Sequence, residues 1–164
     1  MADCIFCTIP DLLCKDTPAY LIGPLTIPEK SRFLSYTIID IIPIISKDEF
    51  STMTIFTPGA RLALSLDEAA QLIAHRKAWL EIMNSKSHYS VVFDSETQLN
   101  DMLTHNRIQN LQLPKDWDIV SISDTQYVLN KRAAKILVES TMQFHSNIAI
   151  LLDSIKILKV IKIR

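Results

Sequence analysis

The sequence predicts an α/β fold, a mixed sheet flanked by helices, and three observations support this prediction. Short apolar, β-branched segments alternate along the chain with segments of helical periodicity, which is the order expected of strands packed against helices. The composition, with 48% hydrophobic and 21% charged residues, is typical of a folded globular domain. A length of 164 residues suffices for one sizeable core but not for two ordinary domains.

Residues 1–33 are predicted to form an irregular N-terminal arm, because several prolines interrupt them and they show little periodicity. The folded domain is therefore predicted over residues 34–164. Its first strand is expected at 36–45, where the run YTIIDIIPII is apolar and β-branched. Pro43 cannot donate to a neighbouring strand, so it should lie near the end or at an edge. A second short strand is expected at 52–56.

The clearest element is a helix predicted over residues 66–84, after a turn at Pro58-Gly59. Ser65 and Glu68 have the spacing of a capping box, in which the serine oxygen accepts from the backbone and the glutamate returns to the cap. Apolar residues then recur at helical spacing along this segment.

The second half of the chain continues the alternation of strands and helices. Its last segment, 148–163, is strongly apolar, and its pattern does not separate helix from strand. The other predicted elements, in order, are a strand at 89–93, a helix at 96–106, strands at 118–123 and 126–129, and a helix at 131–142.

Charge and glycine content exclude several classes of function. The net charge is −1 and basic residues are scattered, so no clustered footprint for nucleic acid is present. The chain has only two glycines, Gly23 and Gly59. Rossmann and Walker phosphate loops need several glycines close together, so both are excluded.

The N-terminal region predicts a cytoplasmic protein. It has no secretory signal, and no apolar stretch of the chain has the length and composition of a membrane helix. Cys4, Cys7 and Cys14 are an odd number of cysteines without a disulfide framework, which favours a reducing compartment. The C-x-x-C formed by the first two lacks the second pair of ligands that zinc commonly uses, so we interpret all three as reduced thiols.

Two acidic residues, Asp94 and Glu96, follow the strand predicted at 89–93 and raise two alternatives. Side chains two residues apart on an extended strand point the same way, so both carboxylates could hold one Mn²⁺ or Mg²⁺ ion. Alternatively, Asp94 or Ser95 caps the next helix, which explains the same residues without a metal.

Four segments between about 55 and 142 occur in an order that resembles glycosyltransferase family 25, the lipooligosaccharide and procollagen galactosyltransferase group. They are DEAAQLIAHRKAWLEI, VVFDSE, WDIVSIS and QYVLNKRAAKIL. The resemblance implies a single GT-A-like nucleotide-sugar-binding domain. It also implies metal-dependent transfer of a hexose from a nucleotide diphosphate sugar to a hydroxyl acceptor.

Four residues are candidates for roles in such a site. Asp94 and Glu96 would hold the metal, and His75 would contact the nucleotide sugar; the alternative for His75 is a half-buried helix residue beside Trp79. Asp124 would be a catalytic base just beyond a strand end, where ligand sites of α/β sheets tend to lie. Its alternative is an ordinary solvated aspartate in a turn.

Two departures from the family pattern support a competing function. Ser95 replaces the middle acid of the family's triplet, and only residues 123–125 remain between the last two strands. The alternative is therefore a non-catalytic GT-A-like binding or assembly protein, a subunit of a complex or particle. An oligomer or complex is also expected from the N-terminal arm and the apolar tail NIAILLDSIKILKVIKIR, unless the tail is the final strand of the same sheet.

Overall fold

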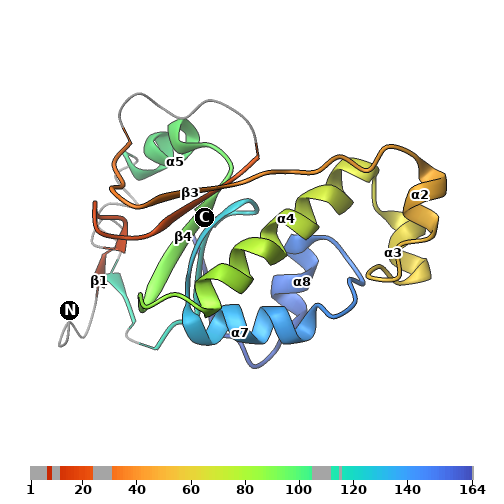
Figure 1. The fold of residues 1–164 in the computed structure, drawn as a ribbon. Helices are drawn as coiled ribbons and strands as arrows, with labels where there is room; N and C mark the ends of the chain where they lie inside the picture. The colour runs from red at the N-terminus through yellow and green to blue at the C-terminus, as the bar shows by residue number, and fades with distance from the viewer. Residues whose placement is uncertain (1–6, 9–11, 24–30, 105–111, 115, 164) are drawn as a thin grey trace.

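The computed structural model describes residues 7–8, 12–23, 31–104, 112–114 and 116–163, and its centre is a six-stranded mixed sheet (Figure 1). Strand β7 is antiparallel to both of its neighbours, whereas every other neighbouring pair is parallel. The strands, in spatial order, are β3 (Tyr36–Ile39), β2 (Ala19–Ile22), β4 (Tyr89–Phe93), β7 (Gln126–Asn130), β6 (Ile119–Ser123) and β8 (Val160–Lys162). A separate antiparallel pair joins β1 (Cys7–Thr8) to β5 (Gln112–Leu113).

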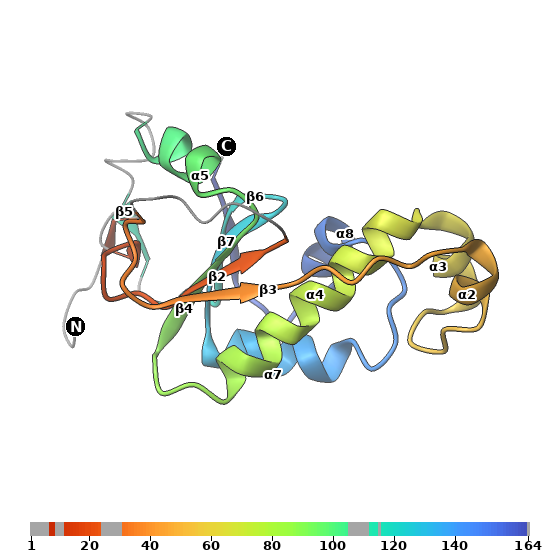
Figure 2. The same cartoon turned by 45° about the horizontal axis from the view of Figure 1, so that its top comes forward.

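Helices cover both faces of the sheet, which confirms the predicted α/β class. One face carries α4 (Leu66–Met83), α7 (Lys131–Ser140) and α8 (Ile148–Ser154), and the other carries α5 (Glu96–Leu103) (Figure 1). Two short helices, α2 (Lys47–Ser51) and α3 (Pro58–Ala63), lie beyond the N-terminal end of α4, away from the sheet (Figure 2).

The strands are apolar on both sides because each sheet face has its own core. In β4, Val92 packs into the core under α4, whereas Val91 and Phe93 pack into the core under α5. In β7, Tyr127 and Val128 divide between the two cores in the same way. A strand covered on both faces has no solvent side, so it shows a continuous apolar run in place of alternation.

The predicted helix start at Ser65 is confirmed. The Ser65 hydroxyl accepts from the Glu68 amide at 3.1 Å, and the Glu68 carboxylate accepts from the Ser65 amide at 3.1 Å. We expect Ser65→Ala to lower the free energy of unfolding by about 1 kcal/mol, because an amide of the first turn loses its partner. Urea denaturation measures this change, and an unchanged midpoint would contradict the role assigned to the cap.

The expectation of an irregular arm over residues 1–33 does not hold for Ala19–Ile22. This segment is β2, which lies between β3 and β4 and pairs with both in parallel. Four residues are too few to show a periodicity, and pairing with segments distant in sequence makes them a central strand. The domain therefore includes part of the predicted arm.

The region 36–63 also differs from the sequence prediction. The first strand ends at Ile39, before Pro43, and the strand expected at 52–56 is absent from the described structure. Pro58 lies in the first turn of α3 with Thr57 as its cap, so the predicted turn is a helix start. Proline suits a first helical turn because its missing amide hydrogen would have no partner there.

The C-terminal tail is built into the fold. Its first half is α8, whose Leu151 and Leu152 are buried, and its end is β8, which pairs in parallel with β6. Only the end of the tail is therefore the final strand of the same sheet, while its first half is a helix. Among the described residues, no helix combines the length and apolar character needed to cross a membrane.

Candidate functional site

The carboxyl ends of β4 and β6 lie at one edge of the sheet. Both strands are antiparallel to β7 between them, so they run in the same direction. Asp94 directly follows β4, and Asp124 lies in the turn between β6 and β7. Ligands of open α/β sheets bind beyond the carboxyl ends of the strands, so this edge is the first place to examine.

Asp94 and Glu96 have different surroundings at this edge. Asp94 is exposed, whereas Glu96 is 4% exposed and is the first residue of α5. Ser95 caps that helix, its hydroxyl accepting from the Gln98 amide at 3.2 Å. Strand β4 ends at Phe93, and Ser95, whose backbone is still extended, caps α5, so the capping alternative describes Ser95 and Glu96 is the first helical residue.

Glu96 is held inside the protein. Its Oε1 accepts from the Ser31 hydroxyl at 3.0 Å and from the Arg32 amide at 2.8 Å, while Oε2 has no hydrogen-bond partner among the described residues. Burial, with the charge of Glu96 nearby, raises the pKa of Tyr36 to about 12. Burial lowers the pKa of Arg32, and the charge of Glu96 opposes this.

The donor set around Glu96 does not fit a divalent cation. The half-buried Arg32 guanidinium is close enough for the charge of Glu96 to affect its pKa, so Glu96 already has a cation nearby. Across the described residues, no group of three or more histidine, cysteine, aspartate or glutamate side chains is arranged to hold a metal ion. The Mn²⁺ or Mg²⁺ site predicted at Asp94 and Glu96 stays a prediction, and Glu96 would have to leave its two hydrogen bonds to form it.

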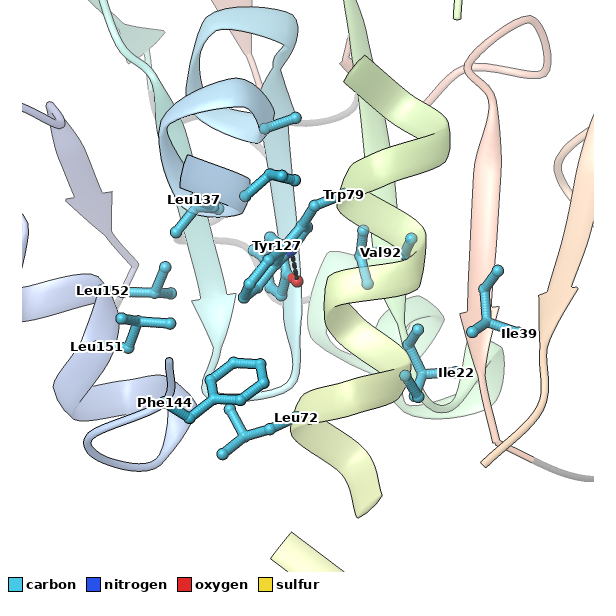
Figure 3. Close-up of a cluster of buried hydrophobic side chains, with 14 of the residues drawn as sticks. Ile22, Ile39, Leu72, Trp79, Val92, Tyr127, Leu137, Phe144, Leu151 and Leu152 are labelled. Carbon is cyan, nitrogen blue, oxygen red and sulfur yellow. Dashed lines mark hydrogen bonds between the residues drawn. The ribbon is translucent and has the colours of Figure 1, made fainter. Parts of the chain in front are cut away.

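His75 is buried in the core between α4 and the sheet, at 2% exposure. Its Nδ1 lies 2.8 Å from the Tyr127 hydroxyl, and Trp79 Nε1 donates to the same hydroxyl at 2.7 Å (Figure 3 shows the Trp79–Tyr127 bond). An indole N–H only donates, so the Tyr127 oxygen accepts from Trp79 and its hydrogen is available for His75. This arrangement makes Nδ1 the acceptor and leaves the ring hydrogen on Nε2.

Burial keeps this hydrogen-bonded group neutral. It lowers the pKa of His75 to about 4, and it raises the pKa of Tyr127 far above its usual range. Around pH 7, His75 is therefore an uncharged imidazole that can donate one hydrogen bond through Nε2.

A pocket of about 170 Å³ brings His75 and Asp124 together. The first turns of α4 and α8 and the β6–β7 turn form its walls. Its remaining lining residues are Glu68, Gln71, Leu72, Asn147 and Ile148. Two of the four predicted site residues thus share one pocket, while Asp94 and Glu96 are not among the residues that line it.

The helical spacing of four pocket residues is visible in the sequence, although it does not by itself indicate a pocket. Glu68, Gln71, Leu72 and His75 are spaced three, four and seven residues from the first, so they lie along one face of α4. From the sequence, Glu68 is assigned to the helix cap and to a segment that resembles the family, but not to a pocket. Asn147 caps α8, its side-chain oxygen accepting from the Ile150 amide at 3.0 Å, and only the tertiary fold brings it to α4.

A larger hollow of about 760 Å³ lies between α2, α3 and the start of α4. Phe50, Leu62 and Leu64 are among its apolar lining residues, and Lys47 and Arg61 are its charged ones. It contains none of the predicted site residues.

The chain matches no protein-family model and has no significant match among curated proteins.

Proposed function

We propose that this chain is a non-catalytic binding or assembly protein built on a GT-A-like domain. In this proposal it is a relative of glycosyltransferase family 25 that keeps the sheet and its helices but lacks the metal-dependent centre. The observation that carries the proposal is the position of Glu96, whose carboxylate is buried and accepts from Ser31 and from the Arg32 amide.

Metal-dependent hexose transfer needs a cation that neutralises the departing diphosphate. Such a cation is held by carboxylate oxygens that converge, together with substrate phosphates. Here Ser95 begins α5 and places Glu96 inside the protein. A carboxylate that already accepts two hydrogen bonds would have to leave both before it could join Asp94 in binding a cation.

The arrangement of the elements supports the GT-A-like part of the proposal. The segments that resemble the family fall, in chain order, on α4, β4, β6, β7 and α7, with α5 and β5 between β4 and β6. The elements that carry these segments all belong to the central sheet or to helices that pack on it, as a mixed-sheet nucleotide-sugar-binding domain requires. Cys14, an exposed free thiol, is compatible with the cytoplasmic location that we include in the proposal.

The second candidate is hexose transfer from a nucleotide diphosphate sugar to a hydroxyl acceptor. The observation that favours it is the shared edge of the sheet, where Asp94, Asp124 and the pocket containing His75 lie. In that case Asp94 would contact the metal and Asp124 would act as the base. This candidate requires Glu96 to rearrange when substrate binds.

Thermal unfolding with Mn²⁺ and uridine diphosphate hexoses tests the choice. We expect no increase in Tm and no hydrolysis of the sugar donor, because a ligand raises Tm only when it binds the native state. We expect the same absence of a Tm increase in two variants, Asp94→Asn and Asp101→Asn. Asp101 is an exposed acid on α5 and serves as the control. A Mn²⁺-dependent increase that Asp94→Asn abolishes and Asp101→Asn preserves would overturn the proposal and establish the second candidate.

A further inference from the structure

We propose that the pocket formed by Glu68, Gln71, His75, Asp124 and Asn147 binds a small neutral polyhydroxyl compound without a metal ion. The inference rests on the proposed function, because it names the class of ligand that a non-catalytic protein of this kind would bind. It follows from the hydrogen-bonding capacity, charge and size of the pocket.

The buried wall of the pocket supplies a neutral donor. Trp79 donates to Tyr127, Tyr127 donates to His75 Nδ1, and the remaining hydrogen of the ring is on Nε2. His75 is a lining residue and Nδ1 is occupied, so Nε2 is the ring atom left for a ligand. No described residue accepts from Nε2, so an oxygen of a ligand in the pocket could accept this hydrogen.

The exposed walls of the pocket supply acceptors. Asp124 carries a carboxylate with no hydrogen bond from the described residues that would occupy it. Glu68 uses Oε1 to accept from the Ser65 amide, which leaves Oε2 for a ligand. The Asn147 side-chain oxygen caps α8, so its NH₂ group is the part that can still bind.

This combination selects against charged ligands. Two carboxylates and no lysine or arginine are among the described lining residues, so a phosphate or carboxylate would meet repulsion without compensation. An ammonium ion would suit the carboxylates but would leave the His75 N–H without an acceptor. A hydroxyl both accepts and donates, so neighbouring hydroxyls of one ligand satisfy His75 and Asp124 together.

Pocket size limits the ligand to about one ring. The volume of about 170 Å³ lies below the ~300–1,000 Å³ of pockets that enclose drug-sized molecules, so the pocket encloses only about one ring of a ligand. Leu72 and Ile148 provide apolar surface for the C–H face of such a ring. A cyclic polyol or a single sugar unit has the required size and chemistry.

Nitrogen-15 NMR of the histidine rings tests the inference, because it reports directly on His75 Nε2. At pH 7 and with EDTA present, we expect His75 in the Nε2–H tautomer, and titration with myo-inositol or D-glucose should shift its Nε2 signal with millimolar affinity. Asp124→Asn should weaken this binding by about tenfold, because a hydrogen bond to a charged group is lost. Asp67→Asn, next to Glu68 but outside the lining, should leave it unchanged.

Three results would overturn the inference: no shift with either polyol, a stronger response to glucose 1-phosphate or ethanolamine, or full binding by Asp124→Asn. The readout is separate from the test of the proposed function. Polyol binding is measured with EDTA and without nucleotide. If no polyol binds, the proposed function is still tested separately, by measuring Tm with Mn²⁺ and the sugar donor. Conversely, a Mn²⁺ site at Asp94 would overturn the proposed function without altering the His75 signal.

Discussion

Replacing Asp118 with alanine is expected to lower the free energy of unfolding by about 3 kcal/mol, because a buried carboxylate that joins three segments is lost. Its Oδ2 accepts from Arg132 Nη1 at 2.6 Å and from the Lys159 amide at 2.9 Å, and its Oδ1 accepts from Asn130 Nδ2 at 3.2 Å. Asp118 is 5% exposed, so little water replaces these bonds. The residue connects the start of β6 to α7 and to the segment before β8.

Asp116→Ala is the matched control, since Asp116 also pairs with a basic residue nearby but both partners are exposed. Exposed ion pairs contribute little, so this variant should unfold at nearly the same urea concentration as the parent. Equal losses in the two variants would contradict the role that we assign to burial at Asp118.

Stability is expected to fall by about 3 kcal/mol between pH 6.5 and pH 4, because the buried His75 accepts a proton only at a lower pH than it does in the unfolded chain. Burial lowers its pKa to about 4 in the folded state, from an ordinary value of 6.5. Between these values the unfolded chain binds the proton and the folded chain does not, so acid favours unfolding. Below pH 4 both states are protonated at His75, and its contribution no longer changes.

His75→Gln should remove this pH dependence, because glutamine does not titrate, although it also lowers stability at pH 7. Chemical denaturation at several pH values from 7.5 to 4.5 measures both effects. An identical slope in the parent and the variant would show that other groups cause the acid sensitivity.

A different residue is expected to act at lower pH. Burial would raise the pKa of Asp118, but the Lys159 amide, Arg132 and Asn130 donate to its carboxylate, and the net effect lowers the pKa. A carboxyl group whose pKa is lower in the folded protein than in the unfolded chain stabilises the fold at pH values above its unfolded pKa. This stabilisation is lost as the pH falls through its folded pKa. The acid sensitivity of Asp118→Ala should therefore differ from the parent mainly below about pH 4.

Local signals were sufficient for several elements. The capping box at Ser65 predicted the start of α4, and the β-branched run before Asp94 predicted β4. The alternation of strands and helices predicted the α/β class. Each of these depends on residues close in sequence, whose preferences hold wherever the element is finally placed.

Long-range pairing decided the elements that the sequence prediction missed. Ala19–Ile22 becomes a central strand only because β3 and β4 lie on both sides of it. The apolar tail divides into α8 and β8 because β6 offers a free side for pairing. No pattern within these short segments contains that information.

The candidate site shows the same division. The sequence by itself determined which residues could carry chemistry: the acids after β4, the histidine on α4 and the aspartate in the β6–β7 turn. Only the tertiary structure decided that Glu96 faces Ser31 and Arg32, and that His75 shares a pocket with Asp124. The physical reason is that the direction of the Glu96 side chain depends on where the cap at Ser95 begins α5, and the position of His75 depends on the packing of α4 against β7. The second of these joins residues that are far apart in the chain.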